Sequence, residues 1–262
     1  LALRPNDIDA HYSRGCALRR LGRNGDALAA FDRALAVAPR FAKAHNNRGS
    51  TLVDMHRYDE ARASFDTALA IEPHFAEALV NRGGLRMLEH RFAEAVADYD
   101  AAFAASLDGT SSPDGTREHA IDARLPFARG ARMLARLRRN DWAGFEHERA
   151  ALVDGTRAGT GSAIPLVMLA ITDSPEDQLR CARAWTAARL PPANVRLWRG
   201  ERYAHDRIRV AYLSSDLHDH PVSYLMAGVF EAHDRARFET IALSAGPDTD
   251  TPMRVRLKQA FE

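Results

Sequence analysis

The residues best suited to chemistry lie in one short loop, which holds two serines, two aspartates and two histidines. The loop begins at Ser214, ends at His220 and is followed directly by Pro221. Proline at this place is typical of the first residue of a helix, where its missing N–H costs nothing. The helix dipole favours the neutral form of a histidine just before it. Because a neutral imidazole can accept a proton from a hydroxyl group, His220 is the candidate catalytic residue.

The elements around this loop predict a β–α–β unit. A run rich in β-branched and aromatic residues begins at Ile208 and ends at Leu213, which is typical of a buried parallel strand. Apolar residues on one face continue the expected helix from Pro221 to Phe230, and a second strand is expected from Phe238. In open α/β sheets, ligands bind at the carboxyl ends of the strands. The loop lies at such an end.

Other kinds of site are not indicated. The chain has no G-x-G-x-x-G and no Walker loop, so a nicotinamide or ATP site is not expected. His218, Asp219 and His220 have no second ligand cluster, so we expect no metal and no cofactor. With 36 basic and 35 acidic residues, no bulk charge favours nucleic acid or a membrane as partner.

Cysteine usage and hydropathy indicate the compartment. Cys16 and Cys181 are far apart in patterns typical of helices, which indicates a reducing environment and no disulfide framework. No run of about 20 apolar residues is present. We therefore expect a cytoplasmic protein.

The N-terminal third is a repeat array with a period of 34 residues. The recurring positions are Gly15, Gly49 and Gly83; Ala27, Ala61 and Ala95; Phe31, Phe65 and Tyr99; Ala34, Ala68 and Ala102; Pro5, Pro39 and Pro73. This is the tetratricopeptide pattern of two helices per repeat. The small residues let paired helices approach, the aromatic residue fills the space between them, and the proline ends the second helix. We expect six antiparallel helices over residues 8–106, and further repeats upstream because a solenoid normally ends in a capping unit.

Two features together resemble a known family. The stretch VAYLSSDLHDHPVSYLM, residues 210–226, is similar to the opening of the catalytic region of O-linked N-acetylglucosamine transferases. His220-Pro221 stands at the His-Pro of that family, and tetratricopeptide repeats precede it, as they do there. The segment from Asp141 to Leu179 resembles the connector of bacterial members. The loop departs from the family at Leu217-His218-Asp219, where a Phe-Gly pair is usual and glycine could supply a positive φ.

The resemblance implies a mostly α fold: a tetratricopeptide α-solenoid followed by the start of a Rossmann-like lobe of the glycosyltransferase-B type. It implies that His220 lies in the active site, as a base, as a contact to the donor phosphates, or as a helix cap. It also implies that Asn47 and Asn81 belong to an asparagine ladder that binds the backbone of an acceptor peptide. An amide suits this role because it offers a donor and an acceptor. A solvated polar face, or a bond to a neighbouring repeat, is the alternative, and the third ladder position is Ser13.

The residues after the repeats predict three further segments. Residues 1–106 are expected to hold the repeats, residues 107–120 a loop insertion, residues 121–205 a degenerate repeat and helical connector, and residues 206–262 the beginning of the N-terminal catalytic lobe. The degenerate repeat rests on four residues that follow repeat positions by 116: Leu134, Leu137, Ala143 and Ala150 follow Leu18, Leu21, Ala27 and Ala34. Three periods make 102, so an insertion of 14 residues is implied. We expect a solvated face, rather than a surface for an acidic partner, from four arginines: Arg129, Arg132, Arg136 and Arg139.

The function that follows is protein glycosylation. We expect a parent enzyme that moves N-acetylglucosamine from UDP-GlcNAc to Ser or Thr of proteins, with its main donor site downstream of Glu262 and with acceptors on the concave repeat face. The 262-residue chain alone is expected to be inactive. The alternatives are a non-catalytic repeat scaffold for protein binding and a related transferase with another sugar donor or acceptor.

Overall fold

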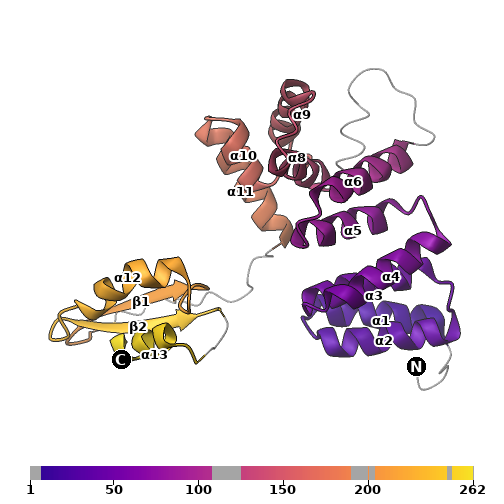
Figure 1. The fold of residues 1–262 in the computed structure, drawn as a ribbon. Helices are drawn as coiled ribbons and strands as arrows, with labels where there is room; N and C mark the ends of the chain where they lie inside the picture. Colours follow the sequence, from indigo (N-terminus) through magenta and orange to yellow (C-terminus); the bar gives the residue numbers. More distant parts are fainter. Residues whose placement is uncertain (1–6, 108–124, 190–199, 201–203, 247–249, 262) are drawn as a thin grey trace. The chain divides into compact units, whose positions relative to one another are not determined.

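The computed structural model describes residues 7–107, 125–189, 200, 204–246 and 250–261. The chain divides into two compact units, Leu1–Pro192 and Ala193–Glu262 (Figure 1). The first is helical and the second contains a small parallel sheet with helices. The predicted fold class is therefore confirmed.

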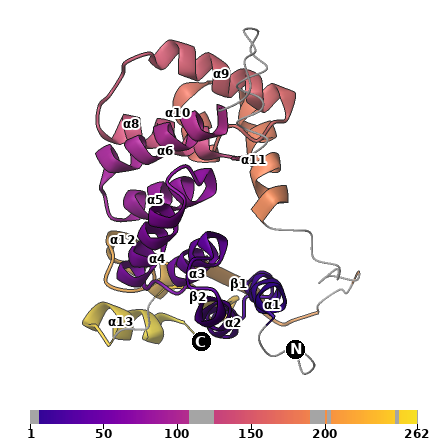
Figure 2. The ribbon, with the colours of Figure 1, turned by 90° about the vertical axis from the view of Figure 1, so that its right-hand side faces the viewer.

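The first unit begins with three helix pairs, one for each predicted repeat. Their bounds are Ile8–Arg20 (α1) and Asn24–Val37 (α2), Ala42–Asp54 (α3) and Tyr58–Ile71 (α4), Ala76–Leu88 (α5) and Phe92–Leu107 (α6). The two helices of each pair pack closely, and the first helices α1, α3 and α5 contact one another in turn. Figure 2 shows the pairs stacked along the unit. The six helices predicted over this stretch are confirmed.

The glycine of each repeat lies against the aromatic ring of the second helix. A Cβ on Gly49 would lie 2.6 Å from Cε1 of Phe65, and one on Gly83 would lie 3.1 Å from Cε1 of Tyr99. Non-bonded carbons normally approach to about 3.5–4.0 Å. The Phe65 ring is fully buried and fills the space that a side chain at residue 49 would need. This confirms the prediction that the aromatic residue fills the space left by the small residue.

A fourth helix pair follows, but its sequence register was predicted wrongly. Helix α8 spans Ala128–Arg138 and helix α9 spans Phe145–Ala158. Ala143 precedes α9, and both Ala143 and Ala150 are exposed. Ala27 and Ala34, their supposed counterparts, are completely buried. An offset of 116 residues from the first repeat therefore does not align α9 with α2.

Ion pairs reveal the true register. In the third repeat Arg82 and Arg86 hold the buried carboxylate of Asp98, with N–O distances of 2.8 and 2.6 Å. In the fourth pair the buried carboxylate of Glu148 is held by two arginines in the same way, Arg132 at 2.6 Å and Arg136 at 2.9 Å. Each member of the second set lies 50 residues after its counterpart. The insertion is therefore 50 less 34, or 16 residues.

This register also corrects the expectation of a solvated arginine face. Arg129 is buried, and Arg132 contacts Asp100 of α6 at 2.6 Å as well as Glu148 of α9. Three of the four arginines, Arg129, Arg132 and Arg136, are thus buried or paired between helices, and Arg139 is solvent-exposed as predicted. Leu152 takes the buried position of Ala102 in the third repeat, 50 residues earlier, and both are fully buried.

Two helices complete the described part of the first unit. They are Pro165–Ile171 (α10) and Pro175–Arg189 (α11). Ser174 caps α11, because its Oγ accepts a hydrogen bond of 3.3 Å from the Asp177 N–H. A separate core joins α8, α9, α10 and α11 and includes Met133, Leu152, Met168 and Cys181. In the described ranges, no helix has the length and apolar character needed to cross a membrane.

The second unit is the predicted β–α–β arrangement followed by one more helix, but β1 was wrongly predicted to be buried, because none of its residues is buried among the described residues. Its elements are Ile208–Ser214 (β1), Pro221–Glu231 (α12), Phe238–Ser244 (β2) and Pro252–Ala260 (α13). The strands are parallel, with Tyr212 opposite Ala242, and these two residues pack on the core that α12 and α13 share. The predicted insertion at residues 107–120 lies outside the described residues, apart from the end of α6, and so do residues 190–199 and 201–203 of the predicted connector.

Candidate functional site

The loop after β1 places His220 at the start of α12. His220 is the N-cap residue, with extended backbone (φ −143°, ψ 146°), and Pro221 is the first helical residue. Its Nδ1 accepts a hydrogen bond of 3.3 Å from the Val222 N–H, and it lies 4.0 Å from Oδ2 of Asp216. Of the three roles that the sequence leaves open for this histidine, helix capping is directly visible.

The cap bond also determines where the neutral ring carries its proton. A neutral imidazole has one nitrogen that donates and one that accepts. Nδ1 of His220 accepts from Val222, so the proton of the neutral ring is on Nε2. The side chain is 40% exposed, so a ligand can reach the ring. In this state His220 offers a ligand a hydrogen-bond donor.

The rest of the loop is fixed by short hydrogen bonds from residues of α12 and α13. Ser223 Oγ donates to the Asp216 carbonyl at 2.5 Å, and Tyr224 donates to the Asp219 carboxylate at 2.6 Å. The latter bond raises the pKa of Tyr224. Arg254 of α13 donates to the Leu217 carbonyl at 2.5 Å. The loop is thus tied at two backbone carbonyls and one side chain.

The departure from the family at Leu217-His218-Asp219 requires no unusual backbone. None of these residues has a positive φ, and the Leu217 side chain is buried in the core of the second unit. A glycine is needed elsewhere. A Cβ on Gly246, just after β2, would collide with the Ser215 carbonyl oxygen. The close approach of the two strand ends therefore depends on Gly246, which sequence reasoning missed.

In the first unit, Asn47 and Asn81 belong to a chain of side-chain hydrogen bonds between repeats. Asn81 Nδ2 donates to Asn46 Oδ1 at 2.9 Å, Asn46 Nδ2 lies 3.5 Å from Asn47 Oδ1, and Asn47 Nδ2 donates to the Tyr12 hydroxyl at 2.9 Å. The chain joins α5 to α3 and α3 to α1. Asn46, buried within it, was not predicted.

The two asparagines differ in what remains available to a ligand. Asn47 also directs Nδ2 to the Cys16 sulfur at 3.3 Å, and its Oδ1 faces Asn46. Asn81 uses one N–H toward Asn46, and among the described residues its Oδ1 has no partner. Asn81 can therefore offer both a donor and an acceptor to a peptide, which is the property that a ladder position requires.

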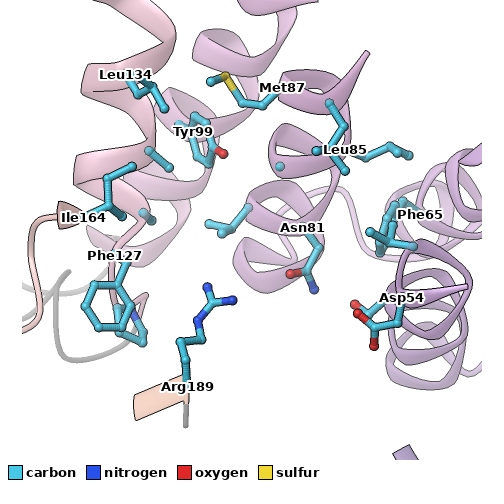
Figure 3. Close-up of a pocket in the computed structure, with 18 of the residues that line it drawn as sticks. Asp54, Phe65, Asn81, Leu85, Met87, Tyr99, Phe127, Leu134, Ile164 and Arg189 are labelled. Atoms are coloured by element: carbon cyan, nitrogen blue, oxygen red, sulfur yellow. The ribbon is translucent and has the colours of Figure 1, made fainter. Parts of the chain in front are cut away.

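A groove with two adjoining pockets runs along the first helices of the pairs. One pocket, of about 340 Å³, is lined by Asn47, and the other, of about 500 Å³, by Asn81. Arg19 and Asp54 border both pockets and pair at 2.8 Å. The larger pocket is shown in Figure 3, where Asn81 and Arg189 point toward the same space.

Sequence reasoning missed three residues of the larger pocket: Tyr99, Trp185 and Arg189. One signal was present, because Tyr99 adds a hydroxyl where the other two repeats have phenylalanine. The other two lie near the end of α11, outside the repeat pattern. Of the described residues, no group of three or more His, Cys, Asp or Glu side chains is arranged to hold a metal ion.

Comparison with known proteins separates the two parts of the chain. Residues 193–262 match the model of the family described as Glycosyl transferase family 41. Residues 42–75 and residues 12–53 match models described as Tetratricopeptide repeat. The segment with His220 and the predicted repeats thus match separate models.

Individual proteins are similar over limited stretches. A protein of Arabidopsis thaliana, named as probable UDP-N-acetylglucosamine–peptide N-acetylglucosaminyltransferase SEC, is 36% identical over 56 residues, or 21% of this chain and 6% of that protein. An O-GlcNAc transferase mutant of Thermobaculum terrenum aligns over 97% of this chain and 40% of its own, with 21% identity and a TM-score of 0.41. The TPR2B domain of yeast Sti1 aligns over 39% of this chain and 82% of its own, with 20% identity and a TM-score of 0.38.

The order of these parts confirms the resemblance predicted from the sequence. The repeat matches lie before the transferase match, and the curated relative carries a name from the same group of enzymes. The chain therefore joins tetratricopeptide repeats to a segment similar to glycosyl transferase family 41, and in both parts it resembles the tetratricopeptide-repeat O-linked N-acetylglucosamine transferase-like family.

Proposed function

We propose that this chain is part of a glycosyltransferase that moves N-acetylglucosamine from UDP-GlcNAc to Ser or Thr hydroxyls of proteins. The observation that carries the proposal is the family 41 match at residues 193–262, within which His220 begins α12 just beyond the carboxyl end of β1. The repeat groove before it would present the protein acceptor.

The chemistry requires one bond exchange and one proton transfer. The acceptor oxygen bonds to C1 of the sugar while the bond from C1 to the diphosphate oxygen breaks, and UDP leaves with the electron pair. The acceptor hydroxyl gives up its proton. A general base can take this proton, and hydrogen-bond donors can stabilise the charge on the leaving diphosphate.

His220 fits the second of these tasks without rearrangement. Its neutral ring carries a proton on Nε2, because Nδ1 accepts the cap bond from Val222. An N–H directed at an anionic phosphate oxygen makes a strong, charge-assisted bond. To act as a base through Nδ1, the ring would first have to give up the cap bond. We therefore propose the phosphate contact as the primary role of His220 and the general base as the alternative.

The acceptor would lie along the groove as an extended polypeptide, with Asn47 and Asn81 beside its backbone. Asn81 has an amide oxygen and one N–H available for this purpose, whereas Asn47 is largely engaged with Tyr12 and Cys16. We propose that Asn81 contributes more of the backbone contact. The reaction would need no cofactor and no metal ion, and the protein would act in the cytoplasm.

The donor site would lie mainly outside this chain. Two parallel strands, β1 and β2, are described in the second unit, and a complete α/β lobe is built from more strands than this. We propose that the 262-residue chain alone lacks transferase activity and that its second unit contributes His220 to a site completed by downstream sequence.

The test is a transfer assay with the full-length protein and UDP-GlcNAc labelled in the sugar. Label should enter protein, and β-elimination should release it, as expected for a bond to Ser or Thr. Other labelled nucleotide sugars should transfer poorly in parallel reactions. Transfer from another nucleotide sugar alone would change the donor. Peptide binding without transfer from any donor would leave the repeats as a scaffold.

The acceptor role has its own test, the double change of Asn47 and Asn81 to Ala. Each hydrogen bond lost is worth about 0.5–1.5 kcal/mol, so glycosylation of proteins should fall several-fold to roughly a hundredfold. A short peptide that occupies only the catalytic cleft should react normally. Equal loss for both substrates would show damage to the asparagine chain between repeats instead of loss of acceptor binding.

A further inference from the structure

The larger pocket of the groove has walls built from distant parts of the first unit. It lies between α3, α5 and α8 and is closed on one side by the end of α11. Trp185 of α11 stands edge to face against Phe127, with ring centroids 4.7 Å apart. Phe127 has a left-handed backbone (φ 66°) just before α8, which is unusual for a large side chain. Its N–H donates to the Gly161 carbonyl at 2.7 Å, and this bond helps to hold the aromatic wall in place.

Most of the lining is apolar, with few polar groups inside. Its walls include Val53, Leu85, Ala131, Leu134 and Ile164. A volume of about 500 Å³ lies within the range of specific ligand sites, which are largely apolar with a few fixed polar groups. The space is large enough for a bulky side chain of a bound polypeptide.

One of the polar groups is a hydroxyl that lacks a partner. Tyr99 is 2% exposed, and its ring packs near Gly83 as Phe65 packs near Gly49. No described residue hydrogen-bonds its hydroxyl. Figure 3 shows this hydroxyl directed into the pocket. The hydroxyl is not one of the buried side-chain atoms without a partner, so it is open to the pocket that Tyr99 lines, where water or a polar group of a ligand can pair with it.

The pocket also carries one unbalanced positive charge. Arg189 lies over the Trp185 ring, with its Cζ 4.5 Å from the ring centroid, and none of the described acidic residues pairs with it. The other two charges at the pocket, Arg19 and Asp54, neutralise each other at 2.8 Å. The guanidinium of Arg189 is therefore available for an anion.

We propose that this pocket binds a linear acceptor segment that carries a bulky apolar side chain next to an acidic residue. The apolar side chain fills the apolar part of the pocket, a backbone carbonyl of the segment accepts a hydrogen bond from the Tyr99 hydroxyl, the acidic side chain pairs with Arg189, and Asn81 holds the backbone between them. The second, smaller pocket at Asn47 continues the groove past Arg19 and Asp54, which suits an extended polypeptide better than a compact small molecule. This inference rests on the proposed acceptor role of the repeats and adds the sequence that they select.

Gly84 provides a way to fill the pocket without disturbing the fold. It lies in α5 on the pocket wall, and a Cβ there would meet nothing nearer than the Tyr99 hydroxyl at 4.0 Å. Gly84→Leu therefore puts a side chain into the pocket and also improves helix propensity. Gly25→Leu is the matched control, because a Cβ at Gly25 of α2 has no neighbour within 4 Å and lies outside the pocket.

The probes are fluorescein-labelled Ser/Gly peptides that carry a single Leu-Asp, Leu-Asn or Ser-Asp pair, and affinity is measured on the 262-residue chain by fluorescence anisotropy. The Leu-Asp peptide should bind most tightly. Gly84→Leu should weaken it about 10- to 100-fold, the value of burying one leucine side chain. Arg189→Gln should make Leu-Asp and Leu-Asn peptides bind alike, a loss of several-fold that shrinks as salt is added. Gly25→Leu should bind as the wild type does.

The outcomes separate this inference from the proposed function. If Asn47→Ala with Asn81→Ala weakens every peptide while Gly84→Leu and Arg189→Gln change nothing, peptides bind the groove but not this pocket, and the inference is overturned while the acceptor role stands. Failure of the wild-type chain to bind any of the peptides would also overturn it. The transfer assay, which does not depend on these peptides, would then decide the proposed function by itself.

Discussion

Replacing Gly49 with Ala should destabilise the first unit, although alanine is the better helix former. The new Cβ would lie 2.6 Å from Cε1 and 2.8 Å from Cδ1 of Phe65, about 1 Å closer than carbon atoms normally approach. The ring is fully buried and cannot move away without shifting α4. Such overpacking typically costs about 1–3 kcal/mol, and the gain in helix propensity returns about 1 kcal/mol. The net loss should be up to about 2 kcal/mol.

The neighbouring repeat supplies the control within one helix. A Cβ on Gly84 would have its nearest contact at 4.0 Å, so Gly84→Ala should keep the whole propensity gain of up to about 1 kcal/mol. Gly83→Ala, with its nearest contact at 3.1 Å, should fall between the two. Urea unfolding followed by far-UV circular dichroism gives the order. A Gly49→Ala protein as stable as Gly84→Ala would refute the packing argument.

A double-mutant cycle identifies the ring as the cause. In a Phe65→Leu background the Gly49→Ala change should lose most of its cost, because the aromatic edge that it meets is gone. The coupling between the two sites should be about 1–3 kcal/mol. If the cost of Gly49→Ala were the same with and without the ring, the strain would lie in the α3 backbone instead.

Three other predictions concern single side chains. In the full-length enzyme, His220→Ala should lower turnover far more than thermal stability: kcat should fall by about 10²–10⁴-fold if His220 is a general base, and by less, with part of the effect in KM, if it contacts phosphate. His218→Ala should be nearly silent. The reverse pattern would show that the active-site histidine is His218 and not His220. Asp98→Asn should lower the free energy of unfolding in urea by about 2–4 kcal/mol, because Asp98 is buried between two arginines. The control is Asp66→Asn: Asp66 is half exposed, so this change should cost less than about 1 kcal/mol. Burial raises the pKa of Cys181 to about 11, so its thiol should resist iodoacetamide at pH 8 until the chain unfolds. Because the pKa in the folded state is above the unfolded value, the protonated thiol contributes its full stability below about pH 8.5, and this contribution is lost as the pH rises toward 11. Rapid alkylation of Cys181 in the folded protein would contradict its burial.

The repeats were predictable because their determinants are local and periodic. Gly49 and Phe65 are 16 residues apart in one helical hairpin, and the same pair recurs in each repeat, so packing follows from spacing. The β–α–β unit was predictable for a similar reason. Its strand, loop and Pro221 are adjacent in sequence, and the helix start fixes the place of His220.

The fourth helix pair was only partly predictable, because its aromatic residue is missing. In the register of the structure, the position of Tyr99 is Arg149, and small apolar residues gave a plausible alignment that was two residues out. The decisive feature was the carboxylate of Glu148 between two arginines, which resembles Asp98 in geometry but carries a different residue. The two arginines and the carboxylate keep the same spacing in both repeats, but the sequence alone does not show which of the many charged residues pair, and this becomes visible once the helices are placed.

The corrected register explains where the asparagine ladder ends and the pocket begins. The sequence alignment placed Arg129 at the ladder position of the fourth pair, 116 residues after Ser13. In the structure, the residue 50 positions after Asn81 is Ala131, and the residue 50 positions after Gly84 is Leu134. Both line the larger pocket. The ladder therefore stops at Asn81, and beyond it the groove wall is apolar.

The two ends of the groove therefore differ in the side chains that line them. In the proposed acceptor role, a peptide that runs from Asn47 toward Asn81 would first meet amides suited to the backbone of any sequence and would then reach a pocket suited to a side chain. The pocket is closed by Trp185 and Arg189 from α11, which is not part of a repeat. In the proposed acceptor role, selectivity would therefore arise at the end of the array, where Ala131 rather than an asparagine lines the pocket.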